Sequence, residues 1–348
     1  MTEIEILKDL VKFNTIKDKD NKKIINYIEK YLKDLKFKTV YKNKILIMKN
    51  KEECAITFIG HSDTVEITNG WKTDPLTLTK KDNKLYGLGT CDMKGGIACF
   101  LKAIQDFDLD ALNKGIQIII TYDEEIGFNG ILDVLKYNKK YNILKSNLYI
   151  IGEPTNNKYL TGCKGLYAIE LFTKGIKVHS STPNKGKSAI SLMIKVINEL
   201  QLSYENKIKL NKYDCYEVPF TTMNIGLLNG GSAKNSVAQD CYSYIDFRVA
   251  DSMHIKMLQN KLDKLCKKYP DFSYKEEENI KPFYNEIDYI KESGTAGFMT
   301  EASFVEGNRI ILGPGPVTAH EINEYVTIER LDKAVKQYKE LIKINCCK

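Results

Sequence analysis

Residues 55–63 read AITFIGHSD, an apolar run that passes directly into a histidine and an aspartate. A short apolar run of this kind is typical of a strand that is buried on both faces. Further apolar runs and stretches of helical apolar spacing lie over residues 115–122, 147–152 and 309–312 (strands) and 20–35 and 93–104 (helices). Buried strands that alternate with helices predict an α/β domain with a largely parallel central sheet flanked by helices.

The middle of the chain has a different pattern. It predicts, in order, a strand over 166–173, a helix over 188–202, strands near 220–228 and 238–249, a helix through 255–265 and a short strand near 271–275. This β-α-β-β-α-β order is the ferredoxin-like motif. We therefore expect a discontinuous catalytic domain, residues 1–164 and 276–348, interrupted by an inserted domain over residues 165–275.

Composition excludes several classes of protein. The net charge is +7, but lysines are interleaved with acidic residues and form no basic stripe with aromatics, so nucleic-acid binding is not expected. No apolar run approaches the ~20 residues of a membrane-spanning helix. The N-terminus lacks the pattern of a secretory signal, which favours a cytoplasmic location. Nine cysteines without paired CxxC spacing predict free thiols rather than disulfides or a cysteine-zinc site.

Polar side chains follow the ends of the predicted strands, where ligands bind in open α/β sheets. They are His61, Asp63, Glu124, Glu125, Glu153 and His320, and Asp92 lies in a glycine-rich turn over 87–96. Each residue alone fits a structural role. Together they are harder to explain, because clustered buried carboxylates repel one another unless a cation neutralises them. Nitrogen and oxygen ligands without thiolate suit Zn²⁺, with Co²⁺ or Mn²⁺ as substitutes.

Five motifs occur in a characteristic order along the chain. They are GHSDTV (60–65), GLGTCDMKG (87–95), DEE (123–125), GEPT (152–155), and GPG (313–315) with His320 and NEY (323–325). In these motifs the sequence resembles the co-catalytic dinuclear zinc amidohydrolases and peptidases, which include acetylornithine deacetylase, succinyl-diaminopimelate desuccinylase, aminoacylase and carboxypeptidase G. The acetylornithine deacetylases look most similar, through LYGLGT (85–90), HSS (179–181) and TEA (300–302).

The resemblance implies two Zn²⁺ ions per chain. Their ligands would be His61 and Glu153 on one ion, Glu125 and His320 on the other, and Asp92 bridging both. Asp63 would accept the second ring N–H of His61 and fix its tautomer. Glu124 would be the general base that takes a proton from water and returns it to the leaving amine. The peptide bond between residues 92 and 93 is expected to be cis.

The resemblance also implies a homodimer formed through the inserted domain. His179 would reach across the dimer to stabilise the oxyanion, and a surface histidine on a loop is the alternative. Asn235 and Arg248 match positions that contact the substrate carboxylate, for which Arg248 offers a two-pronged donor.

Thr300 and Glu301 are expected to line the substrate pocket, with Glu301 as a partner for the δ-ammonium of ornithine. The alternative is that Glu301 is an exposed residue at a helix start, where the dipole favours it. The segment 293–295 could instead be the counterpart of this motif.

The expected activity is hydrolysis of the amide bond of an N-acyl amino acid. The resemblance favours conversion of N-acetyl-L-ornithine to L-ornithine and acetate in arginine biosynthesis. N-succinyl-diaminopimelate desuccinylase and a broader aminoacylase or dipeptidase are the alternatives, since they share the chemistry and differ in pocket contacts. A metal-binding or scaffolding protein without turnover is disfavoured, because the expected base and all five expected ligands are present.

Overall fold

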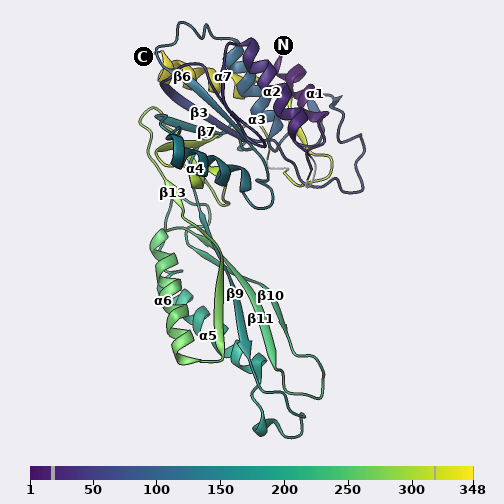
Figure 1. Cartoon of the computed structure of the whole chain (residues 1–348), viewed down its shortest axis with the longest axis vertical. Coiled ribbons are helices and arrows are strands. Elements are labelled where there is room, and N and C mark those ends of the chain that lie inside the picture. The colour runs from purple at the N-terminus through teal and green to yellow at the C-terminus, as the bar shows by residue number, and fades with distance from the viewer. Residues whose placement is uncertain (17–19, 317–318, 348) are drawn as a thin grey trace. The chain divides into compact units, whose positions relative to one another are not determined.

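The computed structural model describes residues 1–16, 20–316 and 319–347 (Figure 1). The chain divides into two compact units. Unit 1 comprises Met1–Thr161, Asn285–Gly294 and Thr300–Lys348, and unit 2 comprises Gly162–Tyr284 and Thr295–Met299.

A mixed sheet forms the centre of unit 1. Its strands, in spatial order, are β1 (Lys38–Lys42), β2 (Leu46–Lys49), β6 (Gly115–Thr121), β3 (Cys54–His61), β7 (Leu148–Ile151), β15 (Asn308–Ile311) and β8 (Leu160–Cys163). The four middle strands β6, β3, β7 and β15 are parallel, and the strands outside them pair antiparallel. The apolar runs therefore predicted the parallel centre of the sheet correctly, because strands covered on both faces carry few polar residues.

Helices cover both faces of this sheet. They are α1 (Glu3–Val11), α2 (Lys22–Asp34), α3 (Lys94–Gln105), α4 (Asn129–Tyr141) and α7 (Ile328–Cys346). Buried residues of α1, α2, α3 and α7 form one core with the strands, whereas Ile131 and Val134 of α4 are buried outside that core. Figure 1 shows α4 on the other side of the strands. Among the described residues, no helix is long and apolar enough to cross a membrane.

Smaller elements complete unit 1. A second sheet has the order β16 (Tyr325–Thr327), β5 (Lys84–Tyr86) and β4 (Thr79–Lys81), and η2 (Glu301–Phe304) is a 3₁₀ helix. The β16–β5 pairing brings residues 84–86 beside residues 325–327. It therefore joins the start of the glycine-rich turn to the segment that follows His320.

Unit 2 contains one antiparallel sheet and two long helices. The elements follow one another as β9 (Gly165–Lys174), α5 (Ala189–Lys207), β10 (Thr222–Gly230), β11 (Asp240–Val249), α6 (Ser252–Lys268) and β12 (Phe272–Ile280), with η1 (Pro183–Lys185) before α5. The spatial order is β10-β11-β9-β12, which is the ferredoxin-like arrangement. Alternate residues of β9 and β11 form a core with α5 and α6. Short strands β13 (Phe283–Tyr284) and β14 (Gly294–Ala296) both pair with β8.

Several elements of unit 2 are longer than the sequence predicted. The strand expected near 271–275 extends to Ile280, and the helix expected over 188–202 extends to Lys207. β12 is an edge strand in which Glu276, Glu277 and Glu278 interrupt the apolar alternation, and the pairing register shifts between Glu276 and Glu278. Such an irregularity interrupts the alternation of inward- and outward-facing residues. The sequence pattern therefore predicted a strand that ends too early.

Candidate metal centre

The parallel centre of the sheet brings the predicted polar residues to one edge. β3 ends at His61, and the segments after β6, β7 and β15 lead to Glu124 and Glu125, to Glu153 and to His320. Because these strands are parallel, their carboxyl ends lie at the same edge of the sheet. The fold therefore gathers side chains that are up to 259 residues apart in the sequence, since 320 − 61 = 259.

Close backbone packing places Asp92 at this edge of the sheet. A Cβ atom on Gly96 would overlap the carbonyl oxygen of Gly152, so glycine is required where α3 approaches the end of β7. The Asp92–Met93 peptide bond is cis, as the resemblance implied. The backbone N–H of His61 donates to Met93 Sδ at 3.3 Å, which ties the end of β3 to the same turn.

His61 lies at the centre of the acidic cluster. Its Nε2 is 2.9 Å from Asp92 Oδ1 and 3.7 Å from Glu153 Oε1. Single ligand atoms of His61, Asp92 and Glu125 lie within 4.8 Å of one another, and the same holds for His61, Glu124 and Glu153. The structure thus brings together Asp92, Glu125 and Glu153 of the expected ligand set, and it adds Glu124 to the same cluster.

His320 approaches the cluster through a single carboxylate. Its Nε2 lies 2.8 Å from Glu125 Oε2, the pairing that the resemblance implied for the second ion. The ring remains 59% exposed, whereas Glu125 is 6% exposed. The His320–Glu125 pair is therefore the accessible side of the cluster.

Asp63 contacts His61 from the opposite side of the ring. His61 Nδ1 is 3.1 Å from the backbone oxygen of Asp63 and 3.5 Å from its Oδ1. The other carboxylate oxygen accepts the backbone N–H of Glu125 at 3.3 Å. Asp63 thus contacts both the histidine and the loop of the glutamates, which suits a residue that orients ligands.

The electrostatics of the cluster favour a bound cation. Burial raises the pKa of Glu124 and of Glu153 well above the usual range, and the charge of Asp92 adds to both shifts. Burial and Asp92 also raise the pKa of Glu125 to about 7. Glu153 Oε1 is buried without a hydrogen-bond partner. Divalent cations would neutralise these carboxylates, and a nitrogen and oxygen donor set suits Zn²⁺, Co²⁺ or Mn²⁺.

Glu301 is buried, so the alternative of an exposed residue at a helix start is wrong. It begins η2 but is 0% exposed, because η2 packs against β7 and α4. Burial raises its pKa to about 7, although the charge of His61 opposes the shift. Thr300 is also buried, and its Oγ1 accepts the backbone N–H of Ala302 at 3.2 Å as the cap of η2. The sequence did not predict this capping role.

The predicted site residues of unit 2 lie in two places. His179 and Asn235 are exposed on neighbouring loops, where the backbone N–H of Ser180 donates to the backbone oxygen of Asn235 at 2.9 Å. Arg248 lies near the far end of β11, with Nε 3.6 Å from Asp246 Oδ1. Asn235 precedes β11, which begins at Asp240. A strand rises ~3.4 Å per residue, so Arg248 lies roughly 27 Å along the sheet from the start of β11.

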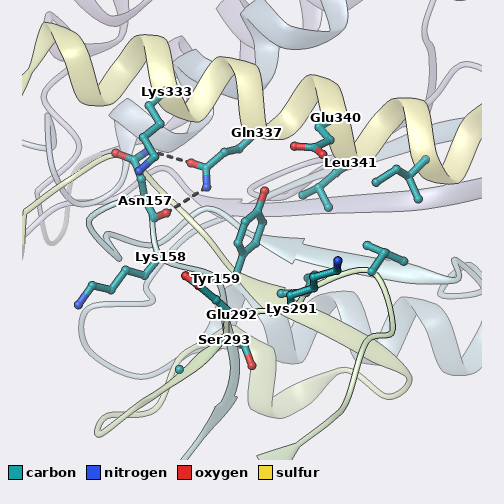
Figure 2. A pocket seen from close by; sticks show the side chains of 14 residues that line it. Asn157, Lys158, Tyr159, Lys291, Glu292, Ser293, Lys333, Gln337, Glu340 and Leu341 are labelled. Carbon is teal, nitrogen blue, oxygen red and sulfur yellow. Dashed lines mark hydrogen bonds between the residues drawn. The ribbon is translucent and has the colours of Figure 1, made fainter.

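A separate cavity of about 700 Å³ lies in unit 1, between α7 and the segments 157–159 and 289–294 (Figure 2). Asn157 Nδ2 donates to Gln337 Oε1 at 3.1 Å, and Gln337 Nε2 donates to the backbone oxygen of Asn157 at 3.0 Å. None of its lining residues belongs to the cluster around His61. The candidate centre is therefore defined by its ligand geometry rather than by this cavity.

Two buried charged residues near the centre received no role from the sequence. Lys94 is fully buried and donates from Nζ to the backbone oxygen of Phe13 at 2.8 Å. Glu324 is 2% exposed and accepts hydrogen bonds from the glycine-rich turn. The available signal was their presence in the motifs over 87–95 and 323–325, since a charged residue inside a buried motif needs a partner.

Comparison with known proteins places this geometry in a family. Residues 57–344 match the sequence profile of peptidase family M20/M25/M40. The chain belongs to this family. It is 29% identical over 353 residues to an acetylornithine deacetylase from Klebsiella pneumoniae (strain 342), covering 93% of this chain and 90% of that protein. It is 30% identical over 358 residues to an acetylornithine deacetylase from Erwinia tasmaniensis, covering 93% and 92%.

Several solved structures share the fold of this M20 chain. A tripeptidase from Staphylococcus aureus matches with a TM-score of 0.78 at 21% identity, covering 98% of this chain and 97% of the other. An M20 metallo-carboxypeptidase from Sulfolobus solfataricus matches at 0.76 and 19%, covering 99% of each chain. A Bacillus subtilis M20 protein described as a dinuclear metal-binding peptidase matches at 0.72 and 11%, covering 98% and 97%. Family and relatives together indicate a metal-dependent amidohydrolase.

Proposed function

We propose that this M20 enzyme hydrolyses N-acetyl-L-ornithine to L-ornithine and acetate, using two Zn²⁺ ions for which Co²⁺ or Mn²⁺ can substitute. The observation that carries the proposal is the cluster around His61, in a chain similar over more than nine-tenths of its length to acetylornithine deacetylases. The reaction belongs to arginine biosynthesis. A cytoplasmic location is part of the proposal, since a sequence with nine cysteines and no paired CxxC spacing suits a reducing compartment.

The proposed roles follow from the contacts within the cluster. Bound metal ions would lower the pKa of water and polarise the substrate carbonyl. Glu124 would take the proton of the attacking water and return it to the leaving amine, and a raised pKa suits a group that must both accept and release a proton near neutral pH. Asp63 would hold the His61 ring in orientation through Nδ1.

The charges of ornithine suggest partners on this chain. Glu301 would bind the δ-ammonium, and its pKa of about 7 would fall when a cation binds beside it. Arg248 would bind the α-carboxylate through its two-pronged guanidinium. N-succinyl-diaminopimelate carries additional carboxylates, which Glu301 would repel, and this difference favours the acetylated substrate.

A homodimer is part of the proposal, and two features of unit 2 support it. Among the described strands of its sheet, β10 is an edge strand with Ile225, Leu227 and Leu228 between 40% and 53% exposed. An exposed apolar edge strand favours pairing with another chain. In addition, Arg248 lies too far along the sheet from His179 and Asn235 for one small substrate to contact all three within a chain. A second copy would supply His179 and Asn235.

A substrate panel tests the proposed function. Metal-stripped enzyme is assayed on N-acetyl-L-ornithine, N-succinyl-diaminopimelate, N-acetylmethionine and a dipeptide, before and after addition of Zn²⁺ or Co²⁺. We expect turnover only with metal and the highest kcat/KM on N-acetyl-L-ornithine. Preference for the succinylated substrate would assign the desuccinylase reaction, and preference for the dipeptide would assign a peptidase. Metal binding without turnover on the panel would contradict the proposal.

The Glu301→Gln variant tests substrate selection. A buried charge-assisted hydrogen bond contributes about 1.5–3 kcal/mol, so its loss should lower kcat/KM for N-acetyl-L-ornithine by about 10- to 150-fold. N-acetylmethionine has an uncharged side chain and should change little. Glu306→Gln, an exposed residue after η2, is the control and should behave as the wild type. Equal losses on both substrates would mean that Glu301 acts on the metal cluster rather than on the ornithine side chain.

A further inference from the structure

Glu324 holds the turn that carries Asp92. Its side chain is 2% exposed and lies immediately before β16. One oxygen accepts the backbone N–H of Gly89 at 2.9 Å, and the other accepts those of Cys91 and Asp92 at 2.6 and 3.0 Å. A carboxylate can accept several such bonds, and hydrogen bonds to an ionised acceptor are the stronger ones. A single side chain therefore accepts hydrogen bonds from three backbone N–H groups of this turn, those of Gly89, Cys91 and Asp92.

The same residue belongs to the segment that carries His320. Its backbone oxygen accepts the N–H of Gly87 at 3.2 Å, and β16 then pairs with β5. Asn323, which precedes it, accepts the backbone N–H of Lys72 through Oδ1 at 2.7 Å. The backbone before and after Glu324 is thus held by hydrogen bonds, so its carboxylate has a fixed position relative to the turn.

We propose that Glu324 is a positioning residue that sets the spacing between the Asp92 turn and the His320 segment, and thereby maintains the affinity of the metal centre. Glu324 does not itself belong to the ligand clusters around His61. Its effect passes through the backbone of Asp92, whose carboxylate lies beside His61. The inference rests on the metal centre proposed above and adds to it a residue outside the ligand set.

The substitution Glu324→Gln tests this role with little change in size. Glutamine offers one oxygen and one NH₂ group, so at least one backbone N–H of the turn would face another donor. Loss of a residue that orients metal ligands typically lowers metal affinity 10- to 100-fold. We therefore expect the Zn²⁺ dissociation constant, measured by competition with a chromophoric chelator, to rise by roughly that factor. Glu321→Gln, an exposed residue of the same segment, should leave it unchanged.

Thermal unfolding with and without metal separates positioning from simple stabilisation. A ligand at concentration L that binds the folded state stabilises it by RT ln(1 + L/Kd), so at a given metal concentration the Tm increase is smaller when the dissociation constant is larger. If Glu324 positions ligands, the Tm increase on adding Zn²⁺ should be smaller in Glu324→Gln than in the wild type. An equal Tm loss in both states, with unchanged Zn²⁺ affinity, would overturn the proposal and leave Glu324 with a structural role.

A second variant covers the case in which Glu324→Gln does not fold. Glu324→Asp keeps the charge but shortens the side chain by one methylene, and it should show the same loss of Zn²⁺ affinity to a smaller extent. Unchanged affinity in a folded Glu324→Asp variant would count against the proposal. If the wild type itself failed to bind Zn²⁺, the metal centre would be wrong, and with it the inference that rests on it.

Discussion

The substitution Glu124→Gln is expected to reduce turnover of N-acetyl-L-ornithine by at least ~10²-fold while the metal content stays close to that of the wild type. General acid–base catalysis contributes about 10²–10⁴-fold, and an amide cannot accept the proton that Glu124 would take from water. The measurement pairs kcat with metal content by atomic emission on the same preparation.

The metal content decides between two roles for Glu124. Its carboxylate lies within 4.8 Å of ligand atoms of His61 and Glu153, so the geometry also suits a metal ligand. Reduced metal content in Glu124→Gln would assign it as a ligand. Near-normal kcat with full metal content would show that another group is the base. Glu66→Gln, an exposed residue that follows β3, is the matched control.

The fold could be predicted where burial leaves a simple pattern. The parallel strands β3, β6, β7 and β15 are covered on both faces, so their sequences are continuous apolar runs. The strands that the pattern did not indicate are short, and two of them, β1 (Lys38–Lys42) and β4 (Thr79–Lys81), are rich in lysine. Their stability comes from pairing with neighbouring strands, which local sequence does not record.

The residues of the site, like the strands, could be predicted from the sequence only in part. The motifs gave the residues of the His61 cluster: all but Asp92 follow strands that the apolar pattern had already located, and Asp92 lies in the glycine-rich turn. They gave no role to Glu324, whose partners are backbone N–H groups and therefore have no signature in side-chain identity. The sequence also left open whether Glu301 lines a pocket or is exposed, since its burial depends on the packing of η2 against β7 and α4.

The substitution His179→Ala is expected to lower kcat by about 10²- to 10³-fold, the usual effect of removing a donor to the oxyanion. The structure places His179 on an exposed loop, where its Nδ1 lies 2.8 Å from Ser181 Oγ, a contact that orients the ring. An unchanged kcat in His179→Ala would show that His179 is a surface residue without a role in catalysis. If the imidazole acts on the partner chain of a homodimer, the lost activity should be recoverable by mixing defective chains.

A mixed dimer of His179→Ala and Glu124→Gln chains tests that arrangement. One of its two sites would combine an intact Glu124 from the first chain with an intact His179 from the second, so about half of the activity of a wild-type dimer should return. The chains are tagged differently, co-expressed and purified through both tags, and each single variant purified in the same way gives the baseline. The separation of Arg248 from His179 and Asn235 along β11 is the reason to expect recovery, because one small substrate cannot reach both ends of the sheet. Verified mixed dimers that stay at the baseline would instead favour a site completed within one chain, with Arg248 outside it.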